Sequence, residues 1–106
     1  MAPLRGSASP MRVLLIEDDL RLARIITRVL EQERFAVDLA ADGDTGLDLA
    51  LTGAYDILIV DRMLPGKDGV AVIKTLRAER VATPALMLTA HSELPDRVEG
   101  LDAGAD

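Results

Sequence analysis

Acidic side chains follow two apolar runs of the sequence, at the point where each run ends. The first run, Leu14–Ile16, leads directly into Glu17, Asp18 and Asp19, and the second, the ILIV of the segment DILIV, leads into Asp61. Three adjacent carboxylates repel one another and raise each other's pKa unless a positive charge lies nearby. The pattern therefore indicates a bound cation.

The chemistry of this acidic set is that of a site for a hard metal ion. Carboxylate oxygens with no histidine or cysteine among them favour Mg²⁺ or another hard divalent ion. Asp61 is also a candidate nucleophile, because a carboxylate can form an acyl phosphate. A metal and an attacking carboxylate in one crevice suit phosphoryl transfer. The acidic run alone fits a solvated loop equally well, and Asp61 after a second apolar run favours the metal site.

The elements that must position these carboxylates alternate along the chain. Short apolar runs without alternation are typical of strands buried on both faces, and apolar residues at helical spacing predict the segments between them. The expected strands are Arg12–Ile16, Phe35–Ala40, Asp56–Val60 and Ala85–Leu88. Three expected helices begin after the capping residues Asp19, Asp42 and Asp68. Their apolar positions are Leu22, Ile26, Val29 and Leu30, then Leu47, Ala50 and Leu51, then Val70, Ile73 and Leu76, and a fourth helix carries Leu94, Val98 and Leu101.

This alternation predicts an α/β fold, a doubly wound parallel sheet with helices on both faces. Ligands of such sheets bind at the carboxyl ends of the strands, where the strand order reverses. If the second strand lies outside the first and the third returns to its other side, the first and third strands are neighbours, about 4.8 Å apart. Asp61 and the acidic run then share one crevice.

Composition restricts the protein to a few classes. The 106 residues, 49% of them hydrophobic, suffice for one packed domain. Aromatic residues make up 2% and the net charge is −6, which argues against this segment gripping nucleic acid or an anionic membrane by itself. The absence of cysteine excludes disulfides and thiol chemistry. We interpret residues 1–10 as a disordered leader before a domain that spans 11–106.

Polar residues elsewhere near the strand ends are weaker candidates. Thr89 ends the fourth strand, where a hydroxyl can hydrogen-bond a phosphoryl oxygen. Arg62 and Lys67 lie in the loop after Asp61, and a solvated loop charge is the simpler interpretation of each. His91 is the only histidine, and a surface position is the simpler interpretation there too.

Together these residues resemble the receiver domain of two-component response regulators, over Met11–Asp106. LLIEDD is similar to the family's acidic motif, and VDRMLPGKDG to its D-x-M-L-P-x-x-D-G signature, with Asp61 at the phosphoacceptor position. LTA places Thr89 at the switch hydroxyl, and EGLDAGAD resembles the segment before the last strand. The resemblance implies a flavodoxin-like sheet with strand order 2-1-3-4.

The resemblance also implies roles for particular residues. A sensor histidine kinase would donate a phosphoryl group from a phosphohistidine to Asp61. Mg²⁺ would be held by Asp18, Asp61 and the main-chain carbonyl of Met63, with Glu17 acting through water. Thr89 would swing toward the phosphoryl group. The protein is then a phosphoacceptor switch and not an enzyme in the usual sense.

The family's fifth strand and fifth helix, its lysine and its aromatic switch residue have no counterpart before Asp106, and Lys67 and Lys74 do not match that lysine. We therefore expect a domain that is incomplete at its C-terminus, in which the fourth strand is an exposed edge. The sequence M-L-P after Asp61 resembles the corresponding sequence in the winged-helix transcription-factor subfamily. This implies a cytoplasmic regulator that binds DNA through a separate output domain and forms homodimers through the face of the fourth helix, fifth strand and fifth helix, with no membrane contact.

Two alternatives remain open at the level of sequence. One is a pseudo-receiver, an interaction module that never takes phosphate. The other is a Mg²⁺-dependent phosphatase with an aspartyl nucleophile, which usually has a second aspartate two residues after the first. Met63 stands at that position, which disfavours the phosphatase.

Overall fold

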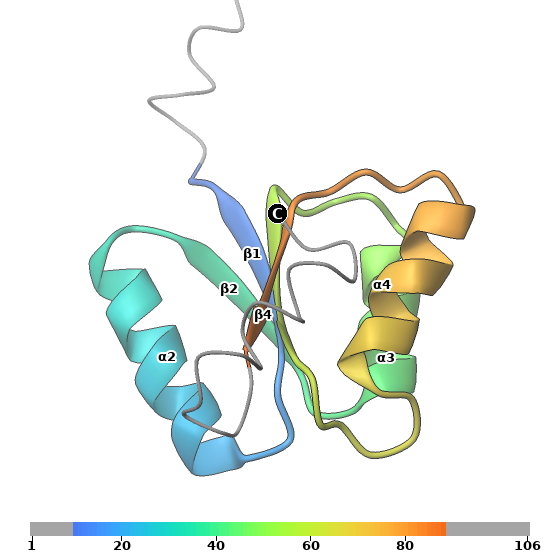
Figure 1. Cartoon of the computed structure of the whole chain (residues 1–106). Helices are drawn as coiled ribbons and strands as arrows, with labels where there is room; N and C mark the ends of the chain where they lie inside the picture. Colours follow the sequence, from blue (N-terminus) through green and yellow to red (C-terminus); the bar gives the residue numbers. More distant parts are fainter. Residues whose placement is uncertain (1–9, 89–106) are drawn as a thin grey trace, which may run out of the picture.

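A parallel sheet forms the centre of the molecule (Figure 1). The computed structural model describes residues 10–88, and within them the sheet has four strands in the order β2-β1-β3-β4. This order confirms the predicted doubly wound sheet with order 2-1-3-4. The strands are β1 (Arg12–Ile16), β2 (Ala36–Ala40), β3 (Ile57–Asp61) and β4 (Ala85–Leu88).

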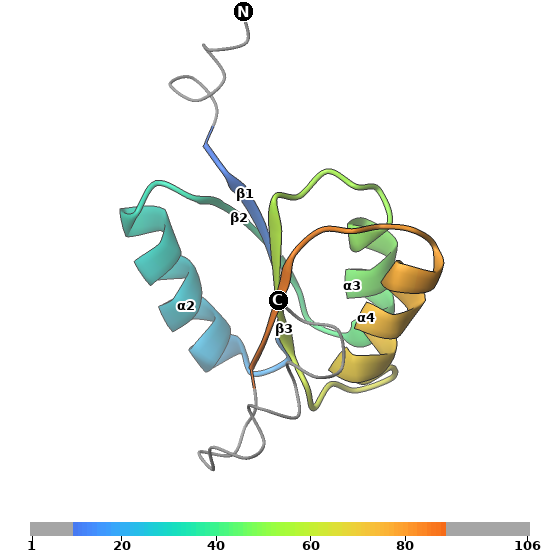
Figure 2. The ribbon, with the colours of Figure 1, turned by 45° about the horizontal axis from the view of Figure 1, so that its top comes forward.

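Helices cover both faces of this sheet (Figures 1 and 2). On one face lies α2 (Leu20–Gln32), and on the other lie α3 (Gly43–Ala50) and α4 (Gly69–Ala78). Each begins where the sequence predicts, because the side chains of Asp19, Asp42 and Asp68 accept hydrogen bonds from backbone N–H groups of the first turn.

Alternate residues of the strands point into two separate cores. Leu14, Ile16, Leu58 and Val60 pack toward α3 and α4. Residues between them, such as Leu15, pack toward α2. Because both faces of the central strands are covered, their sequences are continuously apolar, as expected for buried parallel strands.

The register of β1 and β3 determines where the acidic residues meet. Ile16 pairs with Val60, so Glu17 and Asp61 follow at the same edge of the sheet. On the other side of β3, Asp61 pairs with Leu88 of β4. The predicted neighbourhood of the first and third strands is therefore confirmed.

A polar cluster holds the strands together at the opposite, amino-terminal edge. The hydroxyl of Tyr55 donates to the Asp38 carboxylate at 2.7 Å. The guanidinium of Arg12 lies 5.0 Å from the centre of the Tyr55 ring and 3.3 Å from the same carboxylate. These contacts connect the segments that begin β1 and β3 with β2.

A few boundaries and faces differ from the prediction. β3 begins and ends one residue later than expected, so Asp61 is its last residue, and β2 begins at Ala36 and not at Phe35. Leu51, expected on the apolar face of α3, caps that helix and is 39% exposed, because the chain turns toward Gly53, which has a positive φ of 72°. Leu22 and Val29 belong to α2 as predicted, but they are exposed and do not join the core beneath this helix.

The fourth expected helix and residues 1–9 of the expected leader lie outside the described residues. Among residues 10–88, no helix is both long enough and apolar enough to cross a membrane. β4 is the outer strand of the sheet within this same range.

Candidate metal and phosphoryl site

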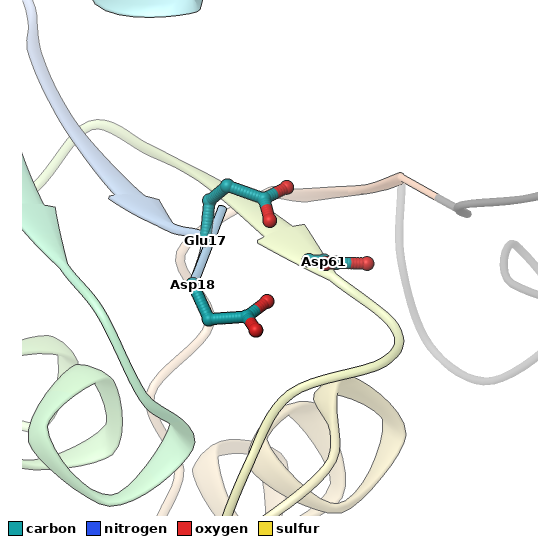
Figure 3. Close-up of side chains that lie close together, drawn as sticks. All are labelled: Glu17, Asp18 and Asp61. Atoms are coloured by element: carbon teal, nitrogen blue, oxygen red, sulfur yellow. The ribbon is translucent and has the colours of Figure 1, made fainter. Parts of the chain in front are cut away.

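Three carboxylates gather at the carboxyl ends of β1 and β3. One oxygen from each of Glu17, Asp18 and Asp61 lies within 4.8 Å of the others. Figure 3 shows the carboxylates of Glu17 and Asp18 directed toward the side on which Asp61 lies. The Glu17 and Asp61 side chains are buried and that of Asp18 is exposed. The site therefore has a buried floor and an exposed rim.

Local backbone contacts give the three consecutive acids different positions. The N–H of Glu17 donates to the carbonyl of Ala40 at 2.9 Å, which prolongs the pairing of β1 with β2 and keeps Glu17 inside. The N–H of Asp19 donates to the Glu17 carboxylate at 3.0 Å. Asp19 itself accepts from the N–H groups of Arg21 and Leu22, so its side chain belongs to the start of α2.

Glu17 is the group whose acidity the fold changes most clearly. Burial raises the pKa of its carboxyl from 4.5 to about 7. A hydrogen bond with Asp61 and the negative charges of Asp61 and Asp18 also raise this pKa, whereas the hydrogen bond from Asp19 lowers it. A carboxyl in these surroundings resists ionisation unless a cation is present.

The donor set fits a hard divalent cation. All three side chains offer oxygen, and two of them are removed from bulk water. Mg²⁺ prefers such oxygens and keeps several waters besides one or two carboxylates. Burial and the neighbouring carboxylates raise the pKa of Glu17, and a cation in the cleft would favour its ionised form.

The loop after β3 closes one side of the site. The N–H of Met63 donates to the Asp61 carboxylate at 3.1 Å, and the Met63 side chain is 60% exposed. The N–H of Arg62 donates to the carbonyl of Leu88, which connects the loop with β4. A cleft results, lined by Glu17, Asp18, Asp19, Leu22, Asp61, Met63 and Leu88.

The structure brings together most of the residues named from the sequence. Glu17, Asp18, Asp61 and Met63 all line the cleft. Within the described part of the chain, Arg62 and Lys67 are not among its lining residues. Thr89 and His91 lie outside the described residues.

Two apolar residues, Leu22 and Leu88, line the cleft although the sequence pattern did not predict them there. Leu22 lies three residues after the cap Asp19, so one turn of helix returns it to the cleft. Leu88 lies beside Asp61 in the strand register. Helix geometry was a usable signal for Leu22, whereas placing Leu88 requires the register.

Comparison with known proteins assigns the chain to a protein family. A family model described as the response regulator receiver domain matches residues 13–106. The transcriptional regulatory protein DltR of Streptococcus agalactiae is 46% identical over 96 residues, which are 91% of this chain and 43% of DltR. TcrA of Mycobacterium tuberculosis, also a transcriptional regulatory protein, is 44% identical over 95% of this chain and 40% of its own length. The chain thus spans about two fifths of these relatives.

Solved structures share the fold over most of the chain. The receiver domain of the Francisella response regulator 1452 has a TM-score of 0.83 and 33% identity, covering 91% of this chain and 79% of that one. The receiver domain of the sensor histidine kinase PA1611 from Pseudomonas aeruginosa PAO1 has a TM-score of 0.83 and 30% identity, covering 92% and 82%. The latter structure has a magnesium ion coordinated in its active site cleft.

Proposed function

The chain belongs to the response regulator receiver domain family, and on this premise we propose that it is a switch whose phosphoryl acceptor is Asp61. The observation that carries the proposal is the position of Asp61 at the end of β3, within 4.8 Å of the Glu17 and Asp18 oxygens. An isolated carboxylate is a poor site for a phosphoryl group, since both are negative. A carboxylate in a cluster that fits a divalent cation avoids this repulsion.

Asp18, Asp61 and the main-chain carbonyl of Met63 would hold Mg²⁺, with Glu17 acting through water. The oxygen-only donor set supports this assignment, as does the magnesium ion in the similar PA1611 domain. When bound, Mg²⁺ supplies positive charge that neutralises the phosphoryl oxygens. The hydrogen bond from Met63 to Asp61 keeps the acceptor carboxylate oriented, and the burial of Asp61 limits its access to water.

In this proposal the phosphoryl donor is a phosphohistidine of a sensor histidine kinase. An oxygen of the Asp61 carboxylate attacks phosphorus and a new P–O bond forms. The P–N bond breaks, and its electron pair leaves with the donor imidazole, which departs neutral if its other nitrogen carries a proton. In this proposal Thr89 donates a hydrogen bond from its hydroxyl to the phosphoryl group, and the neighbouring Leu88 already lies beside Asp61.

We further propose that the switch controls transcription. The relatives DltR and TcrA are named as transcriptional regulatory proteins, and they extend well beyond the part that this chain matches. A separate output domain would then bind DNA, in keeping with the net charge of −6 of this chain. Residues 11–106 would form the receiver domain after a leader at 1–10, in a cytoplasmic protein that dimerises through the face of the fourth helix, fifth strand and fifth helix.

Labelling with a small phosphodonor such as acetyl phosphate tests the acceptor. We expect the purified protein to gain one phosphoryl group by mass spectrometry when Mg²⁺ is present and none in EDTA. Asp61→Asn should abolish labelling, whereas Asp48→Asn, on the exposed side of α3, should retain it. Labelling that survives in Asp61→Asn would disprove the assignment. A wild-type protein that binds no Mg²⁺ would instead favour an interaction module that takes no phosphate.

A further inference from the structure

The loop between β3 and α4, residues 62–68, rests on the first turn of α3. The N–H of Gly43, the first residue of α3, points to the carbonyl of Pro65 at 3.4 Å. Gly43 is buried. Its missing side chain leaves the space that the loop occupies, because a Cβ atom at this position would overlap the Lys67 carbonyl oxygen. The loop main chain and the helix start are therefore in direct contact.

Gly46, one turn later in α3, faces a different kind of neighbour. A Cβ atom there would lie 2.5 Å from the terminal methyl group of Ile16, a side chain of the core. It would also lie 2.8 Å from Cγ1 and Cγ2 of this buried, β-branched residue, so Gly46→Ala would overpack the core but would meet no atom of the loop. A main-chain carbonyl can move only if the loop moves. The two glycines are both buried and both lie in α3, but only Gly43 contacts the loop.

The loop is also held at its other end. A Cβ atom on Gly69, the first residue of α4, would overlap the carbonyl oxygen of Asp61. The N–H of Gly69 donates to the carbonyl of Arg62 at 2.9 Å. The loop thus lies between the first residues of two helices, and Met63, which donates to the Asp61 carboxylate, lies between these two contacts.

We propose that Gly43 is a positioning residue, which seats the β3–α4 loop so that Met63 lies against the Asp61 carboxylate. A side chain at position 43 would push the loop away from α3 and lengthen the hydrogen bond from Met63 to Asp61. The consequence for metal binding rests on the function proposed above, in which the Met63 carbonyl holds Mg²⁺. The consequence for the loop itself does not.

The matched pair Gly43→Ala and Gly46→Ala tests this role. In metal-free protein, we expect faster exchange of the Met63 amide proton, measured by NMR, in Gly43→Ala than in Gly46→Ala. By isothermal titration calorimetry, the Kd for Mg²⁺ should rise about tenfold in Gly43→Ala, as for other supports of metal ligands. In Gly46→Ala the cost should fall mainly on the free energy of unfolding, because the core is overpacked, and the Kd should rise less than in Gly43→Ala, because no atom of the loop is displaced. Equal effects of both variants on exchange and affinity would overturn the proposal.

A second pair covers the case in which Gly43→Ala does not fold. Gly66, in the loop, has a φ of 81°, and a Cβ atom there would lie 3.0 Å from the Asp44 carboxylate of α3. Gly53 has a similar φ of 72° with nothing within 4 Å. Both alanine variants place a side chain at a positive φ, but only in Gly66→Ala does the new Cβ meet a group of α3, the exposed Asp44 carboxylate. Faster Met63 exchange in Gly66→Ala alone supports the role, and unchanged exchange in both overturns it.

Failure of this inference can be told apart from failure of the proposed function. If wild type binds Mg²⁺ and Gly43→Ala binds it equally well with an unchanged Met63 amide, the positioning role is wrong and the proposed site stands. If wild type binds no Mg²⁺, the proposed site fails. The positioning of Met63 by Gly43 is then decided by the exchange rates alone.

Discussion

Glu17, Asp18 and Asp19 are adjacent in the chain, yet each meets different surroundings. Glu17 is 2% exposed and turned inward by its pairing with β2. Asp18 lies at the exposed rim, and Asp19 accepts hydrogen bonds from the start of α2. Like charges in sequence are therefore distributed over a buried acid, a rim ligand candidate and a helix cap.

The buried acid leads to a prediction on stability against pH. The pKa of Glu17 is raised to about 7 in the folded protein, against 4.5 for the ordinary group. The stabilisation that this protonated carboxyl provides is complete below pH 4.5 and is lost as pH rises through about 7. In EDTA above pH 7, Glu17→Gln should therefore be more stable than wild type by on the order of 1 kcal/mol, after allowance for screening.

Urea denaturation of both proteins between pH 4 and pH 8 measures this difference. The two free energies of unfolding should converge near pH 4, because glutamine and protonated glutamate are both neutral. A constant difference across the pH range would mean that the change acts through packing and not through the charge of Glu17.

At the scale of elements, Asp19 has a structural role, because it caps α2, whereas Asp18 is proposed to bind the metal. Asp19→Ala removes the acceptor of the N–H groups of Arg21 and Leu22, and should cost about 1 kcal/mol of stability. Asp19→Asn keeps an acceptor at the cap and should retain nearly all of it. Thermal unfolding of the three proteins measures the effect.

Mg²⁺ titration of Asp19→Asn and of Asp18→Asn tests which of the two side chains binds the metal. Asp19→Asn should bind Mg²⁺ with nearly wild-type affinity, whereas Asp18→Asn should lose most of its binding. If Asp19→Asn binds as poorly as Asp18→Asn, Asp19 is itself a ligand.

The sequence predicts most elements because their signals are local. ILIV, residues 57–60, is apolar at every position since both faces of β3 are covered, and each aspartate cap lies just before its helix. The signal fails where distant contacts decide. Leu88 reaches the cleft only through its pairing with Asp61, and the inward turn of Glu17 depends on Ala40. The contact of the β3–α4 loop with Gly43 at the start of α3 joins two segments that are distant in sequence, and hydrophobic periodicity cannot predict such a contact.

At the scale of the whole molecule, metal binding and folding should be linked. A ligand that binds only the folded state, present at 100 times its Kd, adds about 2.7 kcal/mol to the free energy of unfolding. We expect Mg²⁺ to raise the thermal midpoint of wild type accordingly and to have little effect on Asp18→Asn. Because the chain carries a net charge of −6, NaCl at matched ionic strength is the control for screening. An equal shift with NaCl would contradict specific binding.

The cluster at the opposite edge of the sheet gives the protein an internal optical reference. Tyr55 is the only tyrosine and the chain has no tryptophan, so tyrosine fluorescence arises from this one ring. The ring is fixed by Asp38 and Arg12 at the amino ends of the strands, whereas Asp61 ends β3. Its emission should therefore follow unfolding of the domain while staying largely insensitive to occupancy of the acidic cleft. A tryptophan introduced at the exposed rim would emit at a longer wavelength. Its emission would report changes at the cleft, while that of Tyr55 would report unfolding of the domain in the same sample.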